Sequence, residues 1–136
     1  MDIILDGTRR ALEICPGALF VNASSIGAGS SIDRDPQSAY NVAKRCMEVY
    51  LEYSTGPWGY INYRIPSVYG FGAPADSFVQ RCIDGTAHAP ENPNRIHYIA
   101  HVDDVARAMA DCAEIPIEEI TLGEIYEAFT SGERTL

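Results

Sequence analysis

The sequence of 136 residues has no long hydrophobic run. No apolar stretch approaches the roughly 20 residues that a membrane-spanning helix needs. The N-terminal stretch MDIILDGTRR also lacks the basic start and the small-residue cleavage site of a secretion signal. We therefore expect a cytoplasmic protein that does not span a membrane.

Positive charge is scarce as well. Ten Lys and Arg residues stand against nineteen Asp and Glu residues, which gives a formal net charge of −9. This negative charge opposes sequence-independent binding to nucleic acid or to an anionic membrane surface. Nine of the ten basic residues are arginines, and the single lysine is Lys44. The sequence thus argues against nucleic acid and membrane surfaces as partners.

The four cysteines form no Cys-x-x-Cys pair. They are Cys15, Cys46, Cys82 and Cys112. Neither a zinc knuckle nor a redox motif has their spacing of 31, 36 and 30 residues. We expect reduced, mostly buried thiols and no metal site.

A second group of residues has side chains of the kind that bind a metal ion. His97 and His101 are four residues apart, and Asp103 and Asp104 follow closely. The alternative is structural: His101 lies in a turn between a strand and a helix, and Asp103 caps that helix. We favour the structural interpretation.

What the sequence does contain is typical of one globular domain. Its residues are 46% hydrophobic and 21% charged, which is ordinary for a soluble fold. Helix and strand signals alternate along the chain, and this alternation predicts the α/β class. We expect a single domain over residues 1–136, built as a partial Rossmann-like parallel sheet flanked by helices.

The expected elements follow from periodicity and from breakers. Helices are predicted at about 2–15, 36–53, 76–84 and from 103, and strands at 18–23, 60–65, 96–99 and 125–129. Segment 18–23 is apolar with little alternation, as in an interior strand that helices cover on both faces. Segments 24–31 and 66–74 are predicted to be loops.

The most informative spacing is Tyr40-Asn-Val-Ala-Lys44. Positions four apart share one face of a helix, so the phenol and the ammonium can converge on one point. A tyrosine is a poor base at neutral pH, and a neighbouring cation favours its phenolate. A helix can also carry such a pair by chance, because the chain has eight tyrosines.

Ser25 is a second candidate, because it follows a predicted strand at the start of a small-residue loop. Ligands of parallel sheets bind at the carboxyl ends of the strands. The serine can equally serve only as a turn or cap residue. Residues 23–27, Ala-Ser-Ser-Ile-Gly, also resemble the nucleophile elbow of a serine hydrolase, but that elbow needs a helix at once, whereas residues 27–31 read as a loop.

Five motifs then occur in a characteristic order. They are Gly7-Thr8, Ala23-Ser24-Ser25, Tyr40-x-x-x-Lys44, Arg64-Ile-Pro-Ser-Val-Tyr-Gly70 and His101-Val-Asp-Asp-Val-Ala-Arg107. Over about residues 3–130 the sequence resembles the extended short-chain dehydrogenase/reductases, specifically the NAD-dependent sugar epimerase/dehydratase family. The resemblance implies hydride transfer between NAD or NADP and a carbon of a sugar or nucleotide sugar. The ketone formed is then epimerised, dehydrated, decarboxylated or reduced.

The resemblance also implies roles for the residues of the first three motifs. Tyr40 would be the catalytic acid/base. Lys44 would bind the nicotinamide ribose and favour the ionised tyrosine. Ser25 would donate a hydrogen bond to the substrate oxygen that is oxidised or reduced.

The later motifs imply contacts with the cofactor and the substrate. Pro66 and Val68 would lie against the nicotinamide, and Ser67 and His97 would contact the substrate. Ser67 stands where the family usually has asparagine. His97 stands where nucleotide-sugar enzymes often have an arginine, while Arg95 is two residues away. These exchanges weaken the expectation of a nucleotide-sugar substrate.

Other parts of the family pattern have no counterpart. The strand with Gly-x-x-Gly-x-x-Gly, which would hold the cofactor pyrophosphate, is missing, and Gly27-Ala-Gly29 follows a different strand and lacks the third glycine. Ile4 stands at a position where the family has asparagine. An alternative is therefore a catalytically incomplete relative that oligomerises or binds a partner, or one half of a split enzyme.

The missing strands have a consequence for partners. One edge of strand 18–23 would present unpaired backbone groups, which is an aggregation hazard unless something covers it. Family members dimerise through helices that resemble 2–15 and 36–53, as a four-helix bundle. We expect a homo-oligomer formed through these helices, or a second chain that completes the sheet.

Overall fold

The computed structural model describes residues 2–29, 39–55 and 59–136. The chain divides into two compact units, Met1–Ile65 and Pro66–Leu136. Each unit combines helices with a β-sheet, parallel in the first and mixed in the second. The predicted α/β class is confirmed.

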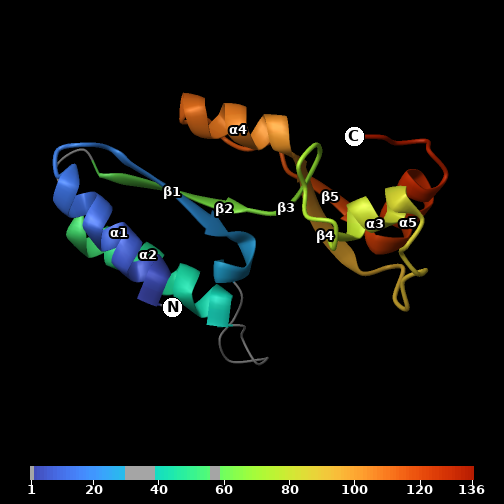
Figure 1. Cartoon of the computed structure of the whole chain (residues 1–136), viewed down its shortest axis with the longest axis horizontal. Helices are drawn as coiled ribbons and strands as arrows, with labels where there is room; N and C mark the ends of the chain where they lie inside the picture. The colour runs from blue at the N-terminus through green and yellow to red at the C-terminus, as the bar shows by residue number, and fades with distance from the viewer. Residues whose placement is uncertain (1, 30–38, 56–58) are drawn as a thin grey trace. The chain divides into compact units, whose positions relative to one another are not determined.

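The first unit holds a two-stranded parallel sheet and two helices (Figure 1). Its elements are α1 (Asp2–Ile14), β1 (Phe20–Ser25), the 3₁₀ turn η1 (Ile26–Gly29), α2 (Ala39–Ser54) and β2 (Tyr60–Ile65). The strands pair in register from Phe20 with Tyr60 to Ser25 with Ile65. Among the described residues, no strand pairs with the other edge of β1. The helix expected at 2–15 and the strand expected at 60–65 are confirmed; the start expected at Asp35 and Pro36 lies outside the described residues.

Helix α2 packs against β1 and β2 and, on its side, against α1. Its buried apolar residues Ala43, Met47 and Leu51 are spaced by four, which places them on one face. The hydroxyl of Thr8 on α1 lies 2.7 Å from the Met47 sulfur. The spacing of apolar residues on α2 thus decides which side of the helix meets the rest of the unit.

Strand β1 differs from its prediction. It buries Asn22 and Ser24 and exposes Ala23, whereas the apolar run predicted cover on both faces. The reason is that in the described part of the unit α1 and α2 lie on one side of the two-stranded sheet (Figure 1). The amide of Asn22 donates to the Asn62 side-chain oxygen at 2.8 Å, so the buried polar group has a partner.

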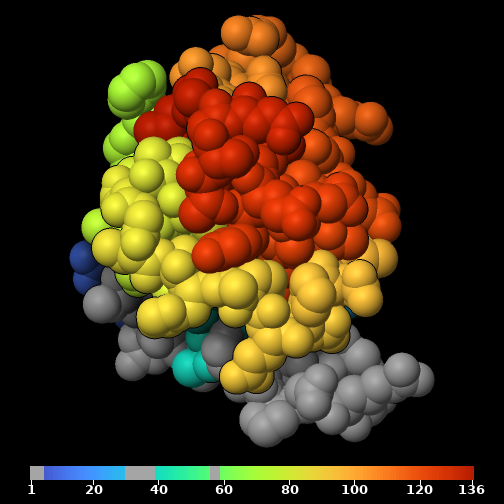
Figure 2. All heavy atoms as spheres, turned by 90° about the vertical axis from the view of Figure 1, so that its right-hand side faces the viewer, coloured from blue at the N-terminus to red at the C-terminus, as the bar shows by residue number. Residues whose placement is uncertain are grey.

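The second unit is built on a three-stranded mixed sheet. Its elements are β3 (Ser67–Tyr69), α3 (Phe78–Asp84), β4 (Ile96–His101), α4 (Val102–Asp111), β5 (Glu118–Thr121) and α5 (Leu122–Thr130). Strand β4 is central, parallel to β3 and antiparallel to β5. Figure 2 shows α3 in yellow beside α5 in red. The core between these helices and the sheet consists of Val79, Cys82, Ile99, Ile120, Ile125 and Phe129.

Two predictions for this unit are wrong. The expected loop 66–74 contains β3, a strand of three residues that pairs with β4. The expected strand 125–129 is part of helix α5, where Ile125 and Phe129 are buried four residues apart on one face. The hydroxyl of Thr121 caps this helix by accepting from the Glu124 amide at 3.2 Å.

The cap of α4 is also different from the expectation. His101, not Asp103, is its N-cap: the His101 Nδ1 accepts from the Asp103 amide at 3.1 Å. Asp103 instead lies in the first turn, where its carboxylate interacts favourably with the helix dipole. The short helix at 76–84 is confirmed, and Gly85 ends it in the left-handed conformation at φ 75°.

The thiols are all free, but the expectation that most are buried is wrong. Cys82 is buried, whereas Cys15, Cys46 and Cys112 are exposed. The described residues hold no group of three or more His, Cys, Asp or Glu side chains that could bind a metal ion. Within the same residues, no helix is both long enough and apolar enough to cross a membrane.

Candidate functional site

Helix α2 presents Tyr40 and Lys44 together. Both residues lie in the described part of the helix, Ala39–Ser54, with Lys44 about one turn after Tyr40. The Lys44 Nζ lies 5.5 Å from the centre of the Tyr40 ring, within the range of a cation–π contact. Tyr40 is 54% exposed, so its phenol is open to a ligand. The predicted convergence of the phenol and the ammonium on one helix face is confirmed.

Lys44 also joins this helix to the end of β1. Its Nζ donates to the Ala23 carbonyl at 2.8 Å, two residues before Ser25. The Ser25 hydroxyl accepts from the Gly27 amide at 3.2 Å, so the serine does serve the turn that follows the strand. This bond uses the serine as an acceptor and leaves its proton for a ligand. The catalytic roles of the three residues stay predictions.

An ion pair with a buried carboxylate lies beside these residues. Glu48 on α2 is 5% exposed, and its carboxylate accepts from the Ser24 hydroxyl at 3.0 Å. Arg64 on β2 donates to both carboxylate oxygens, from Nε at 2.9 Å and from Nη2 at 3.0 Å. The Arg45 Nη1 lies 3.4 Å from the Glu48 Oε2. One carboxylate therefore connects α2 with both strands of the sheet.

The surroundings of Glu48 act on its pKa in opposite directions. Burial alone would raise the pKa, because it disfavours the charged carboxylate. The hydrogen bonds from Arg64 and Ser24, together with the charges of Arg64 and Arg45, outweigh burial and hold the pKa below its ordinary value. The same ion pair raises the pKa of Arg64. Glu48 is thus a carboxylate over the whole neutral range.

The glycines of the turn η1 are explained by close packing. A Cβ on Gly27 would overlap the side-chain amide of Asn41, and one on Gly29 would lie 2.7 Å from Arg64 Nη1. Side chains of this chain thus fill the space beside both glycines. Gly27-Ala-Gly29 therefore does not offer the open backbone that a pyrophosphate needs.

The second unit brings two of the predicted substrate residues together. Ser67 on β3 and His97 on β4 lie 2.9 Å apart, Oγ to Nε2. Burial and the charge of Arg95 both lower the pKa of His97, so its neutral form is favoured. Pro66 is buried and Val68 is half-buried. Ser25, Tyr40 and Lys44 belong to the first unit, whereas Pro66, Ser67, Val68 and His97 belong to the second.

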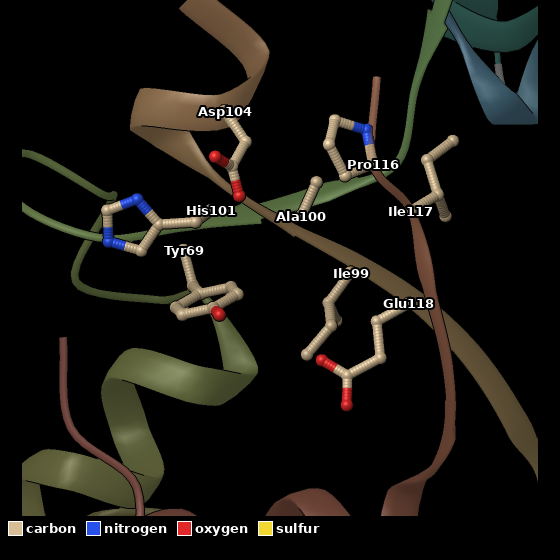
Figure 3. A pocket seen from close by; sticks show the side chains of 8 residues that line it. All are labelled: Tyr69, Ile99, Ala100, His101, Asp104, Pro116, Ile117 and Glu118. Atoms are coloured by element: carbon tan, nitrogen blue, oxygen red, sulfur yellow. The ribbon is translucent and has the colours of Figure 1, made fainter. Parts of the chain in front are cut away.

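The second unit also holds a pocket of about 220 Å³ (Figure 3). Its lining is Tyr69, Ile99, Ala100, His101, Asp104, Pro116, Ile117 and Glu118. Most of its polar groups are paired within the chain: Arg134 donates to the Tyr69 hydroxyl at 3.1 Å and to the Glu118 carboxylate at 2.9 Å. The His101 ring stacks edge-on against Tyr69 at 5.2 Å. No residue predicted as a ligand contact lines this pocket.

Sequence reasoning missed the ion pair of Glu48 and Arg64. One signal was present, because Glu48 continues the spacing of four that begins with Tyr40 and Lys44. An acidic residue at that position lies on the face of the helix that meets the sheet. The arginine partner, 16 residues further along the chain, had no local signal.

Comparison with solved structures shows what this arrangement resembles. A dTDP-glucose 4,6-dehydratase from Bacillus anthracis, solved with NAD, has a TM-score of 0.76 and 17% identity, over 98% of this chain and 53% of its own. A UDP-glucose 4-epimerase from Thermotoga maritima has a TM-score of 0.72 and 20% identity, over 98% and 55%. The chain has the fold of NAD-dependent sugar epimerases and dehydratases.

The same fold serves another substrate class. An L-threonine dehydrogenase from Cupriavidus necator has a TM-score of 0.70 and 14% identity, over 96% of this chain and 54% of its own. The chain spans about half the length of these three structures. No family model and no curated protein matches it. The resemblance predicted from the motifs is confirmed for the fold.

Proposed function

We propose that this chain carries the catalytic segment of an NAD(P)-dependent epimerase/dehydratase-like enzyme that acts on a sugar or nucleotide sugar. The observation that carries the proposal is the placement of Lys44, whose Nζ lies near the Tyr40 ring and binds the Ala23 carbonyl. Lys44 thereby links Tyr40 to β1, the strand that ends at Ser25. The fold shared with nucleotide-sugar enzymes supports the choice of substrate class.

In this proposal each residue has a defined task. The exposed Tyr40 phenol takes a proton from a sugar hydroxyl, or returns it, and the Lys44 ammonium lies beside its ring. Ser25 donates its proton to the same sugar oxygen, since its hydroxyl already accepts from the Gly27 amide. Two donors on one oxygen favour the charge that develops there.

The proposal assigns one end of the cofactor to the first unit. Lys44, together with Tyr40, would hold the nicotinamide ribose. When bound, NAD(P) supplies the hydride acceptor or donor for the sugar carbon. The pyrophosphate finds no matching cradle at Gly27-Ala-Gly29, because Asn41 and Arg64 fill that space.

Cofactor binding tests the proposal directly. NADH is titrated into the 136-residue chain while its fluorescence is recorded, for the wild type, Lys44→Met and Tyr40→Phe. We expect Lys44→Met to weaken binding at least ~10-fold, and Tyr40→Phe to keep binding while abolishing any turnover of UDP-glucose or dTDP-glucose. Arg10→Met on α1 removes the same charge at an exposed site and serves as the control. Absence of binding at millimolar NADH contradicts the proposal.

One observation favours a second function, that of an oligomerising protein. Val42, Cys46, Val49 and Tyr53 are exposed along α2 at spacings of four, three and four, which makes an apolar stripe on one side of the helix. We propose a second copy of this chain as the partner of the stripe, with α1 and α2 of both copies in one helical bundle. Light scattering at tens of micromolar tests it: Val49→Asp should convert a dimer into a monomer, and the exposed control Glu52→Gln should not. A monomeric wild type rejects this function.

A further inference from the structure

The Glu48 ion pair is placed where it can control the geometry of the proposed site. Its carboxylate, 5% exposed, binds Ser24 at 3.0 Å and Arg64 at 2.9 Å. Ser24 directly precedes Ser25, and Arg64 is the register partner of Ser24 on β2. The three side chains therefore meet at the strand ends beside the proposed catalytic serine.

Helix and strand are matched residue by residue at this place. Tyr40, Lys44 and Glu48 follow each other at intervals of four along α2. Lys44 binds Ala23 and Glu48 binds Ser24, which are consecutive residues of β1. A shift of the helix by one residue moves it 1.5 Å and turns it by about 100°, so it would break both bonds at once.

The turn after Ser25 rests on the same two elements. Gly27 lies against Asn41, the neighbour of Tyr40 in sequence, and Gly29 lies against the Arg64 guanidinium. Arg64 thus contacts the turn on one side and Glu48 on the other. A change in the guanidinium position would move both the turn that holds Ser25 and the helix that holds Lys44.

We propose that Glu48 and Arg64 are positioning residues: their ion pair fixes Lys44, and with it Tyr40, against the strand end that carries Ser25. The inference rests on the proposed function for the roles of Ser25, Tyr40 and Lys44. The coupling itself is a property of the first unit and can be measured without turnover.

The single lysine makes a specific reporter. An amine-reactive N-hydroxysuccinimide ester modifies Lys44 at pH 8, and peptide mass spectrometry follows its rate apart from that of the N-terminal amine. We expect Glu48→Ala to raise the rate at least ~3-fold, because α2 opens locally from β1 and frees the amine. Glu48→Gln should raise it less, since its amide oxygen still accepts a hydrogen bond. Glu52→Gln, one turn further on the exposed side of α2, should leave the rate unchanged.

Circular dichroism establishes that each variant is folded at the temperature of labelling. A folded Glu48→Ala variant with a Lys44 rate equal to that of the wild type overturns the proposal. If Glu48→Ala does not fold, Ser24→Ala decides, because it removes one hydrogen bond of the network: a faster rate supports the positioning role, and an unchanged rate overturns it. Failure of the wild type to bind NADH would reject the proposed function and would not alter the Lys44 rates.

Discussion

The free energy of unfolding of the first unit should depend strongly on Arg64. Arg64→Met removes two charge-assisted hydrogen bonds, at 2.9 and 3.0 Å, and leaves the Glu48 carboxylate with Ser24 and the more distant Arg45. Removing one partner of a fully buried pair costs ~3–5 kcal/mol. The Arg64 side chain is 44% exposed, so water screens part of the interaction, and we expect a loss of ~2–3 kcal/mol.

Hydrogen exchange followed by mass spectrometry is the appropriate assay, because it reports on the peptides of each unit separately. Peptides of β1 and α2 should lose protection in Arg64→Met, while those of α5 keep theirs. The double variant Glu48→Leu/Arg64→Met should recover part of the loss, since it leaves no unpaired buried charge. A loss below ~1 kcal/mol in Arg64→Met, or a double variant less stable than Arg64→Met, contradicts the expected contribution of the ion pair.

The Glu48–Arg64 pair also predicts how the free energy of unfolding changes at low pH. Because the folded pKa of Glu48 lies below the ordinary value of 4.5, the unfolded chain binds the proton more readily, and the stabilisation is fully present above about pH 4.5. It is lost as the pH falls through the folded pKa. The stability difference between the wild type and Glu48→Gln should therefore shrink below pH 4.5, as measured by urea denaturation at each pH.

Three further predictions concern single positions. Because burial lowers the pKa of His97 below 6.5, its contribution to stability should fall as the pH drops below 6.5, and its ring signals should titrate with a midpoint under that value by NMR. Phe129→Ala should destabilise the second unit by ~3–5 kcal/mol in urea denaturation, as the ring is 3% exposed in the core. Gly29→Ala should lower the free energy of unfolding by ~1–2 kcal/mol, because its Cβ displaces the Arg64 guanidinium. Gly7→Ala in helix α1, where a Cβ meets open space, should raise it by ~0.5–1 kcal/mol. Equal effects of the two substitutions would contradict these expectations.

Sequence patterns predicted the elements whose signals are local. Strand β2 was predicted with the bounds 60–65 because an aromatic and β-branched run lies between Gly59 and Pro66. Strand β3 was missed for the opposite reason: three residues between Pro66 and Gly70 become a strand only through pairing with β4. Residues 125–129 carry strand-forming side chains, but the Thr121 cap and the core contacts of α5 make them helical.

In the candidate site, too, some contacts follow from local sequence and others depend on tertiary packing. The pairing of Tyr40 with Lys44 needs only the helix and is visible in the sequence. The partners of Glu48 lie 24 and 16 residues away in the sequence, so they depend on the packing of α2 on β1 and β2. The contact of Ser67 with His97 spans 30 residues and depends on the pairing of β3 with β4. Sequence reasoning therefore found the Tyr40–Lys44 pair but not the contacts that depend on tertiary packing.

The negative charge of the chain is concentrated in one unit, and this bears on the substrate. The first unit has seven acidic and six basic residues, for a net charge of −1, and the second has twelve and four, for −8. Such a field opposes a diphosphate ligand in the second unit unless an arginine meets it directly.

Three of the four arginines of that unit are already engaged. Arg107 is paired with Asp104, Arg134 with Glu118, and Arg81 lies over the Phe78 ring. Arg95 is exposed, and its charge acts on the predicted substrate residue His97. Binding of a nucleotide-sugar diphosphate in this unit would therefore depend on Arg95. Arg95→Ala should then weaken UDP-glucose binding in calorimetry ~10-fold and leave NADH binding as it is. Equal affinity of both proteins for UDP-glucose would instead point to a substrate without a diphosphate.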